Sequence, residues 1–260
     1  MKHRPRKRFG QNFLTDNQVI DGIINLIRPR QSDLIVEVGP GRGALTGMLL
    51  ESGCELHVVE LDRDLAAKLV RQYDDADNFH LHSGDVLAMD LAELTGGRQF
   101  RLIGNLPYNI SSPMLFHAFQ WPRQILDMVF MLQKEVVNRM AATPGSSDYG
   151  RLSVMCQFYC QVIPEFIVPP EAFYPPPKVE SRLVRLIPHA RPPVKVGDDS
   201  QFAGLVRLAF SQRRKTLRNA LKIILDQEAI QACGVDPGAR AETLDLAAFA
   251  RLANAAAKSG

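Results

Sequence analysis

The sequence predicts an α/β fold in which a parallel sheet lies between two layers of helices, followed by a small all-helical domain. Three observations lead to this prediction. The first two-thirds of the 260 residues alternates short β-rich runs with helical stretches, a pattern typical of parallel sheets. Most of the β-rich runs are apolar on both sides, as strands covered on both faces must be. Beyond about residue 190 the pattern is purely helical.

Each expected strand is a short run of β-branched and apolar residues. In chain order the runs are 34–38, 56–60, 79–82, 101–104 and 128–132. Two further β-like runs, 158–162 and 182–186, enclose a segment with six prolines between Pro164 and Pro177. Because proline lacks a backbone N–H and has a fixed φ, we expect this segment to be a stiff loop without regular structure that lines a site.

The C-terminal region predicts a separate helical domain. A Pro-rich linker covers 189–199, so we expect one domain over residues 1–189 and a second over residues 190–260. Within the second, an apolar stripe and a basic face lie on opposite sides of one expected helix at about 100° per residue. The stripe is Leu217, Leu221, Ile224 and Leu225, and the basic face is Lys215, Arg218 and Lys222.

Composition narrows the class of protein. Hydrophobic residues make up 46% and charged residues 23%, which is ordinary for a soluble globular protein. No apolar run reaches the roughly 18 residues that a membrane span needs. The basic first eight residues are not followed by the apolar stretch of a secretory signal. We therefore expect a cytoplasmic protein with no membrane association.

The cysteines and histidines do not predict a metal site. The four cysteines form no CxxC pair, so we expect unpaired buried thiols in a reducing compartment. His80 and His82 would share one face of a strand, but no carboxylate or cysteine stands at a matching spacing. We therefore expect no metal ion.

The net charge of +3 is the sum of two basic end regions and an acidic middle region. Residues 1–30 contain seven Lys or Arg and two Asp or Glu, and residues 201–260 contain nine and five. Residues 31–200 contain fifteen and twenty-one. Basic ends around an acidic middle favour a polyanionic partner that is bound from both ends of the sequence.

A glycine-rich segment, Glu37-Val-Gly39-Pro-Gly41-Arg-Gly43, follows the first expected strand. Glycines there let the backbone turn sharply and approach a ligand closely. Glu60 ends the second strand, where a carboxylate can accept hydrogen bonds from ribose hydroxyls, and Asp85 can accept one from an adenine amino group. These features are compatible with a nicotinamide dinucleotide, but Asp85 favours S-adenosylmethionine. The glycine segment resembles the first motif of class I S-adenosylmethionine-dependent methyltransferases, which have a Rossmann-like sheet.

The tetrapeptide Asn105-Leu106-Pro107-Tyr108 after the fourth strand is typical of enzymes that methylate planar exocyclic amines. An adenine amino nitrogen is a poor nucleophile because its lone pair is delocalised into the ring. The Asn105 amide oxygen and the Leu106 carbonyl would accept its hydrogens and direct the lone pair at the methyl group. Pro107 favours an extended Leu106, and Tyr108 offers an aromatic face to the base.

A base reaches such a site only by leaving its stack. A second aromatic side chain should therefore cover the other face of the base. We expect Phe173, within the proline-rich segment, to be that residue.

Eight segments carry motifs of one known family: 8–14, 37–43, 84–85, 105–113, 133–135, 149–153, 173–181 and 210–221. Together they resemble the bacterial small-subunit (16S) ribosomal RNA adenine dimethyltransferases of the kasugamycin-resistance (KsgA) type. This resemblance implies a cofactor site lined by Asn12, Leu14, Gly39, Glu60, Asp85 and Asn105, to which the glycine motif adds Glu37 and Gly41. It further implies two adjacent adenines near the 3′ end of 16S rRNA as substrate, each dimethylated in assembling small subunits.

The resemblance also gives the basic ends a role. Residues 1–189 would be the catalytic, S-adenosylmethionine-binding domain with a basic N-terminal arm, and residues 190–260 a helical RNA-binding domain. The residues expected to contact RNA phosphates are Arg6, Lys7, Arg8, Arg213, Arg214, Lys215, Arg218 and Lys222. Nothing in the sequence requires a protein partner or more than a monomer.

Two other functions remain open at this point. A large-subunit rRNA dimethyltransferase of the macrolide-resistance type would share the catalytic motifs, although the segment 210–221 argues against it. A binding-only ribosome-assembly factor would not need an intact Gly39–Gly43 loop or an intact Asn105–Tyr108 tetrapeptide.

Overall fold

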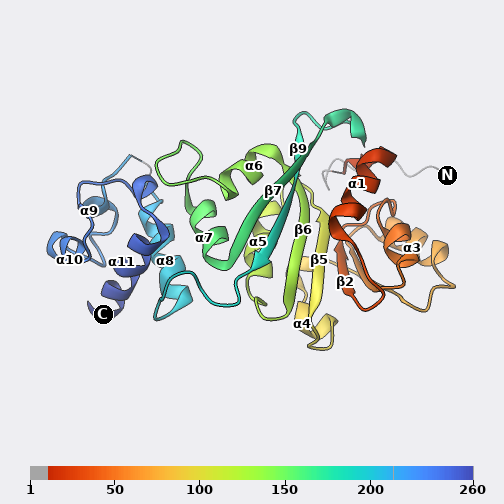
Figure 1. Ribbon diagram of the computed structural model, residues 1–260, viewed down its shortest axis with the longest axis horizontal. Helices are drawn as coiled ribbons and strands as arrows, with labels where there is room; N and C mark the ends of the chain where they lie inside the picture. Colours follow the sequence, from red (N-terminus) through yellow and green to blue (C-terminus); the bar gives the residue numbers. More distant parts are fainter. Residues whose placement is uncertain (1–10, 213, 260) are drawn as a thin grey trace. The chain divides into compact units, whose positions relative to one another are not determined.

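The computed structural model describes residues 11–212 and 214–259 (Figure 1). The chain divides into two compact units. One extends to Val137 and includes Ile163–Pro188, and the other consists of Asn138–Val162 and the chain from His189 onward. The longer stretch of the second unit begins at His189, next to the domain boundary expected at residue 190. The second unit also contains Asn138–Val162, which we expected to belong to the first domain.

The described part of the first unit is built on a seven-stranded sheet in the order β4-β3-β2-β5-β6-β9-β7. The strands are β2 (Leu34–Val38), β3 (Glu55–Glu60), β4 (Phe79–Ser83), β5 (Phe100–Asn105), β6 (Ile125–Gln133), β7 (Cys160–Val168) and β9 (Ser181–Pro188). Strands β2 to β6 pair in parallel, and β9 is antiparallel to β6. In Figure 1, β5, β6 and β9 lie side by side. The predicted α/β class and its five parallel strands are confirmed.

Strand composition explains the sheet's interior. Every residue of β2 is buried, and β5 is buried except at its last residue. Apart from Glu37 and Arg101, the side chains of these runs are apolar on both sides because helices cover both faces of a parallel sheet. At the edge, β4 is only partly buried, in keeping with its two histidines.

The helices of the first unit connect the strands, and several begin at an aspartate. They are α1 (Asn17–Ile27), α2 (Thr46–Glu51), α3 (Arg63–Gln72), α4 (Leu91–Leu94) and α5 (Ser111–Ala118), while α6 (Lys134–Met140) begins in the first unit and ends in the second. Asp16, Asp62 and Asp90 accept hydrogen bonds from the first backbone N–H groups of α1, α3 and α4. On one face of the sheet, Ile20, Ile23 and Ile27 of α1 join a core with side chains from β2, β3, β5 and β6.

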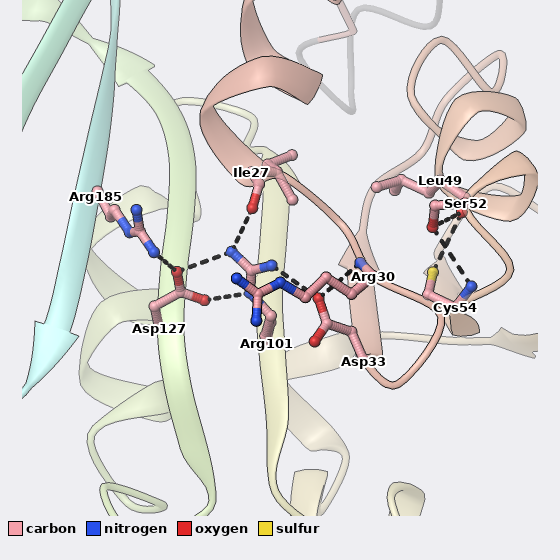
Figure 2. A network of polar contacts seen from close by, with 9 residues as sticks. All are labelled: Ile27, Arg30, Asp33, Leu49, Ser52, Cys54, Arg101, Asp127 and Arg185. Carbon is pink, nitrogen blue, oxygen red and sulfur yellow. Dashed lines mark hydrogen bonds and ion pairs between the residues drawn. The ribbon is translucent and has the colours of Figure 1, made fainter.

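A buried arginine ties the sheet together near the amino ends of β2, β5 and β6 (Figure 2). Arg101 forms ion pairs with Asp127 (Nε–Oδ1, 2.7 Å) and Asp33 (Nη1–Oδ2, 2.9 Å). Its Nη2 also donates to the backbone oxygen of Ile27, and Arg185 donates to Asp127. Because both partners are acidic and close, the buried charge is compensated. This network lies at the opposite end of the strands from their carboxyl ends.

The proline-rich segment differs in part from its expected form. Strand β7 continues through Pro164 to Val168, so the expectation of irregular structure there is wrong. A proline is tolerated because β7 is an edge strand, where a missing N–H removes no ladder bond. The expected strand 158–162 is also wrong in its first two residues, which end α7 (Arg151–Tyr159). Beyond Pro170–Ala172, β8 (Phe173–Tyr174) pairs antiparallel with β1 (Phe13–Leu14).

The described part of the second unit is helical apart from the start of β7. After α7 come α8 (Asp199–Ala209), α9 (Leu217–Ala220), α10 (Gln227–Ala232) and α11 (Leu246–Ser259). Aromatic contacts join these elements, with the Phe158 and Phe202 rings stacked at a centroid distance of 4.4 Å. No helix among the described residues has the length and apolarity that crossing a membrane requires.

The expected long basic helix is a single turn. Only Leu217–Ala220 is helical, and turns follow up to α10. Of the expected apolar stripe, Leu217, Leu221 and Leu225 are buried and Ile224 is partly buried, whereas the expected basic face of Lys215, Arg218 and Lys222 is exposed. All four cysteines are unpaired; Cys54, Cys156 and Cys160 are buried as expected, but Cys233 is only partly buried.

Candidate active site

The glycine segment forms a tight loop at the carboxyl end of β2. Gly39 and Gly41 adopt φ values of +66° and +61°, in the left-handed region that side chains other than glycine rarely occupy. A Cβ on Gly41 would also lie 3.0 Å from the Phe13 ring. The loop therefore presents bare backbone to the space above the sheet.

Glu60, at the end of β3, is bonded to this loop. Its Oε2 accepts a hydrogen bond from the Gly41 N–H at 3.1 Å, and its Oε1 accepts one from the Asp62 N–H at 2.8 Å. Burial raises the pKa of the Glu60 carboxyl, while these two N–H groups oppose the rise. A carboxylate has about four acceptor positions, so Glu60 can still receive a ligand hydroxyl.

Asp85 lies beyond the end of β4 and is exposed. One of its oxygens accepts a hydrogen bond from the Leu87 N–H at 3.0 Å and caps the short turn Val86–Ala88. Asp85 therefore has a structural task as well as a position beside the loop.

Asn105 ends β5 and begins the predicted methylation tetrapeptide. Its Nδ2 donates to the backbone oxygen of Asn12 at 3.4 Å. This long bond uses one of the two amide hydrogens and orients the amide, and the amide oxygen can accept a ligand hydrogen. Tyr108 is half-buried, burial raises the pKa of its hydroxyl, and a hydrogen bond with Ser181 acts in the opposite direction.

A cavity of about 330 Å³ joins these groups at the carboxyl ends of β2, β3, β4 and β5. Ten of the predicted site residues line it: Asn12, Gly39, Gly41, Glu60, Asp85, Asn105, Leu106, Pro107, Tyr108 and Phe173. Its volume falls within the range of small-molecule and cofactor sites. Both halves of the prediction, the cofactor motif and the methylation motif, therefore meet in one space.

Two predicted cofactor residues do not line the cavity. Leu14 is buried in the core of the first unit. Glu37 is 2% exposed and accepts a hydrogen bond from the Thr46 hydroxyl at 2.7 Å. Burial raises the pKa of Glu37 to about 7, an effect that the Thr46 hydrogen bond opposes and the Glu60 charge reinforces.

Phe173 lies between the hydrophobic core of the first unit and the cavity. It is only 4% exposed and belongs to the core of the first unit, yet it also lines the cavity. The pairing of Leu14 with Phe173 in the β1–β8 ribbon brings it there. Its expected stacking role stays a prediction.

The predicted RNA contacts lie partly outside the described residues, because Arg6, Lys7, Arg8 and Arg213 are not among them. The remaining four are on the second unit: Arg214, Lys215, Arg218 and Lys222. All four are exposed. Their role in binding RNA also stays a prediction.

Several lining residues were not identified from the sequence. Gln11, Phe13, Ile110 and Ser181 are among them. Phe13 carries the guanidinium of Arg42 at 4.4 Å from its ring centroid. Phe13 reaches the cavity because β1 pairs with β8. These strands are far apart in the sequence, and no local pattern predicts their pairing.

The groups that line the cavity suit S-adenosylmethionine. Acidic hydrogen-bond acceptors lie at the ends of β3 and β4, the glycine loop offers its backbone, and Val59, Leu65 and Ile110 form an apolar wall. The ligand has a ribose diol, an adenine and a cationic sulfonium, which match acceptors, an apolar slot and an acidic surrounding.

Comparisons with known proteins agree with this assignment. The chain matches the family model described as "Ribosomal RNA adenine dimethylase" over residues 2–258. A protein of Pseudomonas syringae pv. syringae named "Ribosomal RNA small subunit methyltransferase A" is 55% identical, covering 97% of this chain and 95% of its own. One of the same name from Methylococcus capsulatus is 53% identical, covering 97% and 98%.

Solved structures show the same fold. A dimethyladenosine transferase from Plasmodium falciparum superposes with a TM-score of 0.79 at 25% identity, covering 92% of this chain and 95% of its own. The 23S rRNA methyltransferase ErmE has a TM-score of 0.72 at 24% identity, covering 94% and 99%. The class I methyltransferase sheet and the C-terminal helical region are therefore shared along nearly the whole chain.

Proposed function

Because this chain belongs to the ribosomal RNA adenine dimethylase family, we propose that it dimethylates two adjacent adenines near the 3′ end of 16S rRNA in assembling small subunits. The protein is an rRNA methyltransferase that uses S-adenosylmethionine. The proposal concerns the particular RNA, the number of methyl groups and the residues that act.

One observation supports the proposal most directly. The tetrapeptide that begins at Asn105 and the loop that begins at Gly39 line the same cavity. A protein that only bound the subunit would not require this juxtaposition. Relatives named for the small subunit are more than 50% identical over nearly the whole chain, whereas the large-subunit enzyme ErmE is 24% identical.

The residues around the loop would hold S-adenosylmethionine, which supplies an electrophilic methyl group on a sulfonium. Glu60 accepts hydrogen bonds from the ribose hydroxyls with the acceptor positions that Gly41 and Asp62 leave open. Asp85 accepts a hydrogen bond from the cofactor's adenine amino group. Neither role requires these carboxylates to move a proton.

Asn105 orients the target amine. Its Nδ2 is held by the Asn12 carbonyl, so its oxygen accepts one amino hydrogen while the Leu106 carbonyl accepts the other. These two acceptors direct the nitrogen lone pair, released from conjugation, at the place where the methyl group would lie. Bound S-adenosylmethionine would supply the methyl group and keep the S–C electron pair on sulfur, and the methylated amine would then lose its proton to water.

Two aromatic side chains would enclose the extruded base. Tyr108 and Phe173 both line the cavity, and stacking on such rings accepts a base without reading its sequence. The exposed basic residues of the second unit, together with the basic N-terminal arm, would bind phosphates of the surrounding RNA. We place this reaction in the cytoplasm, where bacterial subunits assemble, with the protein acting as a monomer.

The test is methyl transfer from tritiated S-adenosylmethionine to small subunits that lack the adenine methylation. Digestion of the product RNA should yield N6,N6-dimethyladenosine at two neighbouring positions. Large-subunit RNA is the substrate control, and Asn105→Ala is the matched inactive enzyme. Methylation of the large-subunit RNA instead, or label elsewhere in 16S rRNA, would contradict the proposal.

A further inference from the structure

A cluster of imidazoles and one carboxylate lies on the outer two strands of the sheet, apart from the active-site cavity. Glu55 and His57 are two residues apart on β3, so their side chains share one face. His80 on the edge strand β4 is the register partner of His57. One potential ligand atom from each of these three residues lies within 4.8 Å of the others.

The spacing within the cluster approaches that of a metal site. His57 Nε2 lies 3.0 Å from Glu55 Oε1, and ligand atoms in a tetrahedral zinc shell with bonds near 2.0–2.1 Å stand about 3.3 Å apart. The rings of His57 and His80 have centroids 4.7 Å apart. His80 is exposed, so its ring can rotate to complete the approach without disturbing the core.

Outer contacts already hold two of the three groups. His57 Nδ1 lies 3.1 Å from His82 Nε2, so a His57 ring that coordinates through Nε2 can donate its Nδ1 proton to His82. Arg98 binds both Glu55 oxygens, at 2.7 and 2.5 Å. A hydrogen bond such as that between His57 and His82 fixes the tautomer and orientation of a metal ligand, whereas Arg98 must release one Glu55 oxygen before that oxygen coordinates an ion.

We propose that Glu55, His57 and His80 bind one divalent transition-metal ion of the Zn²⁺ class, with water at the remaining position. Two imidazoles and a carboxylate are ligands that Zn²⁺, Co²⁺ and Ni²⁺ accept, whereas Mg²⁺ and Ca²⁺ prefer oxygen alone. The His80–His82 pair gave no such site from the sequence, because the carboxylate and the second ligating imidazole come from the neighbouring strand.

The ion's effect is on the fold and not on methyl transfer. Glu55 begins β3 and Glu60, at the cavity, ends it, a separation of about 16 Å at the usual rise per residue. Coordination across β3 and β4 links an edge strand to its neighbour. The Arg98 guanidinium competes for Glu55, so we expect affinity in the micromolar range.

The experiment uses the full-length chain without an affinity tag. Zn²⁺ is titrated calorimetrically, and Co²⁺ is added separately to record its visible spectrum. We expect one equivalent to bind, a Co²⁺ spectrum without thiolate charge-transfer bands, and a rise in Tm of about 5 °C at saturating Zn²⁺. His80→Gln, at an exposed position, and Glu55→Gln should each weaken binding at least tenfold and remove most of the Tm shift.

His189→Gln is the matched control, since it removes a histidine from the second unit. It should bind Zn²⁺ as the unaltered chain does, and all variants should keep methyltransferase activity. Equal Zn²⁺ affinity in the unaltered chain and in His80→Gln would overturn the proposal, as would the lack of any binding. A thiolate Co²⁺ spectrum would overturn it as well, because the metal would then be at a cysteine.

Discussion

The Glu60 carboxylate is bonded to the Gly41 backbone N–H at 3.1 Å, and this bond joins the end of β3 to the glycine loop. The second Glu60 oxygen accepts the Asp62 N–H, at the start of α3. One buried side chain therefore connects the glycine loop to the junction between β3 and α3. In the proposed function the same carboxylate also receives the ribose of S-adenosylmethionine.

Replacing Glu60 should weaken cofactor binding in a graded way. Glu60→Ala removes every acceptor, and we expect the Kd of S-adenosylmethionine to rise about 10- to 100-fold, as for loss of hydrogen bonds to a charged group. Glu60→Gln keeps one oxygen and should have a smaller effect. Calorimetry with S-adenosylhomocysteine measures this. At saturating cofactor we expect kcat to stay unchanged. An unchanged Kd in Glu60→Ala would contradict the assignment of Glu60 to the ribose.

Phe173 tests whether an aromatic face is needed for the target base. Because Phe173 is buried, truncation to alanine would also leave a cavity, so Phe173→Leu is the better change. We expect kcat/KM on small subunits to fall about 10- to 100-fold, the size of one base–aromatic stacking contact, with cofactor Kd unchanged. Phe173→Tyr, which keeps an aromatic ring, should keep the activity of the unaltered chain.

The control for Phe173 is Phe130→Leu, at a fully buried position on β6. It carries a similar packing cost but does not line the cavity. Equal activity losses in the two variants would mean that Phe173 contributes through packing alone.

The sheet could be predicted because its strands are local patterns. The run that begins at Leu34 is apolar on both faces except at Glu37, and its covered position follows from that pattern. The glycine loop and Asn105 could be placed because the carboxyl ends of parallel strands meet at one edge. Each of these inferences requires only short-range sequence and the general geometry of parallel sheets.

Other features depend on contacts between distant segments. Phe13 enters the cavity through the pairing of β1 with β8, more than 150 residues later. Pro164 indicated a break, yet it is accommodated because β7 happens to be an edge strand. Likewise, Glu37 stands within the cofactor motif but faces Thr46. The position of a strand in the sheet and the face to which a side chain turns are tertiary properties.

The basic residues of the second unit should determine how strongly salt weakens subunit binding. Replacing Arg214, Lys215 and Arg218 together by glutamine would remove three of the proposed phosphate contacts. The slope of log K against log salt should then fall in magnitude by about 2 to 3. Filter binding to small subunits over a range of salt concentrations gives the slope.

A triple replacement in the first unit controls for net charge. Lys68, Arg71 and Arg123 are exposed on helix α3 or before β6, and their change to glutamine removes the same charge. This control should leave the slope close to that of the unaltered chain. Equal slopes in the two triple variants would show that overall charge, not a phosphate-binding surface, governs the interaction.

Glu37 should make the protein less stable as pH rises. In the folded chain the pKa of Glu37 is raised from 4.5 to about 7, so between these values the folded state keeps a proton that the unfolded state has lost. The free energy of unfolding therefore falls as pH rises through this window. Below the pKa of Glu37 in the unfolded chain this loss of stability is absent. Above its pKa in the folded chain the loss is complete and amounts to about 3 kcal/mol.

Glu37→Gln removes the titration and keeps an oxygen that accepts the Thr46 hydroxyl hydrogen. Urea unfolding from about pH 5 to about pH 8 should show the variant gaining on the unaltered chain as pH rises, by about 1–3 kcal/mol at the upper end. Glu51→Gln, exposed at the end of α2, is the control and should leave the profile unchanged. A difference between Glu37→Gln and the unaltered chain that does not vary with pH would mean that Glu37 is ionised in the fold, and that the polar contact with Thr46 outweighs its burial.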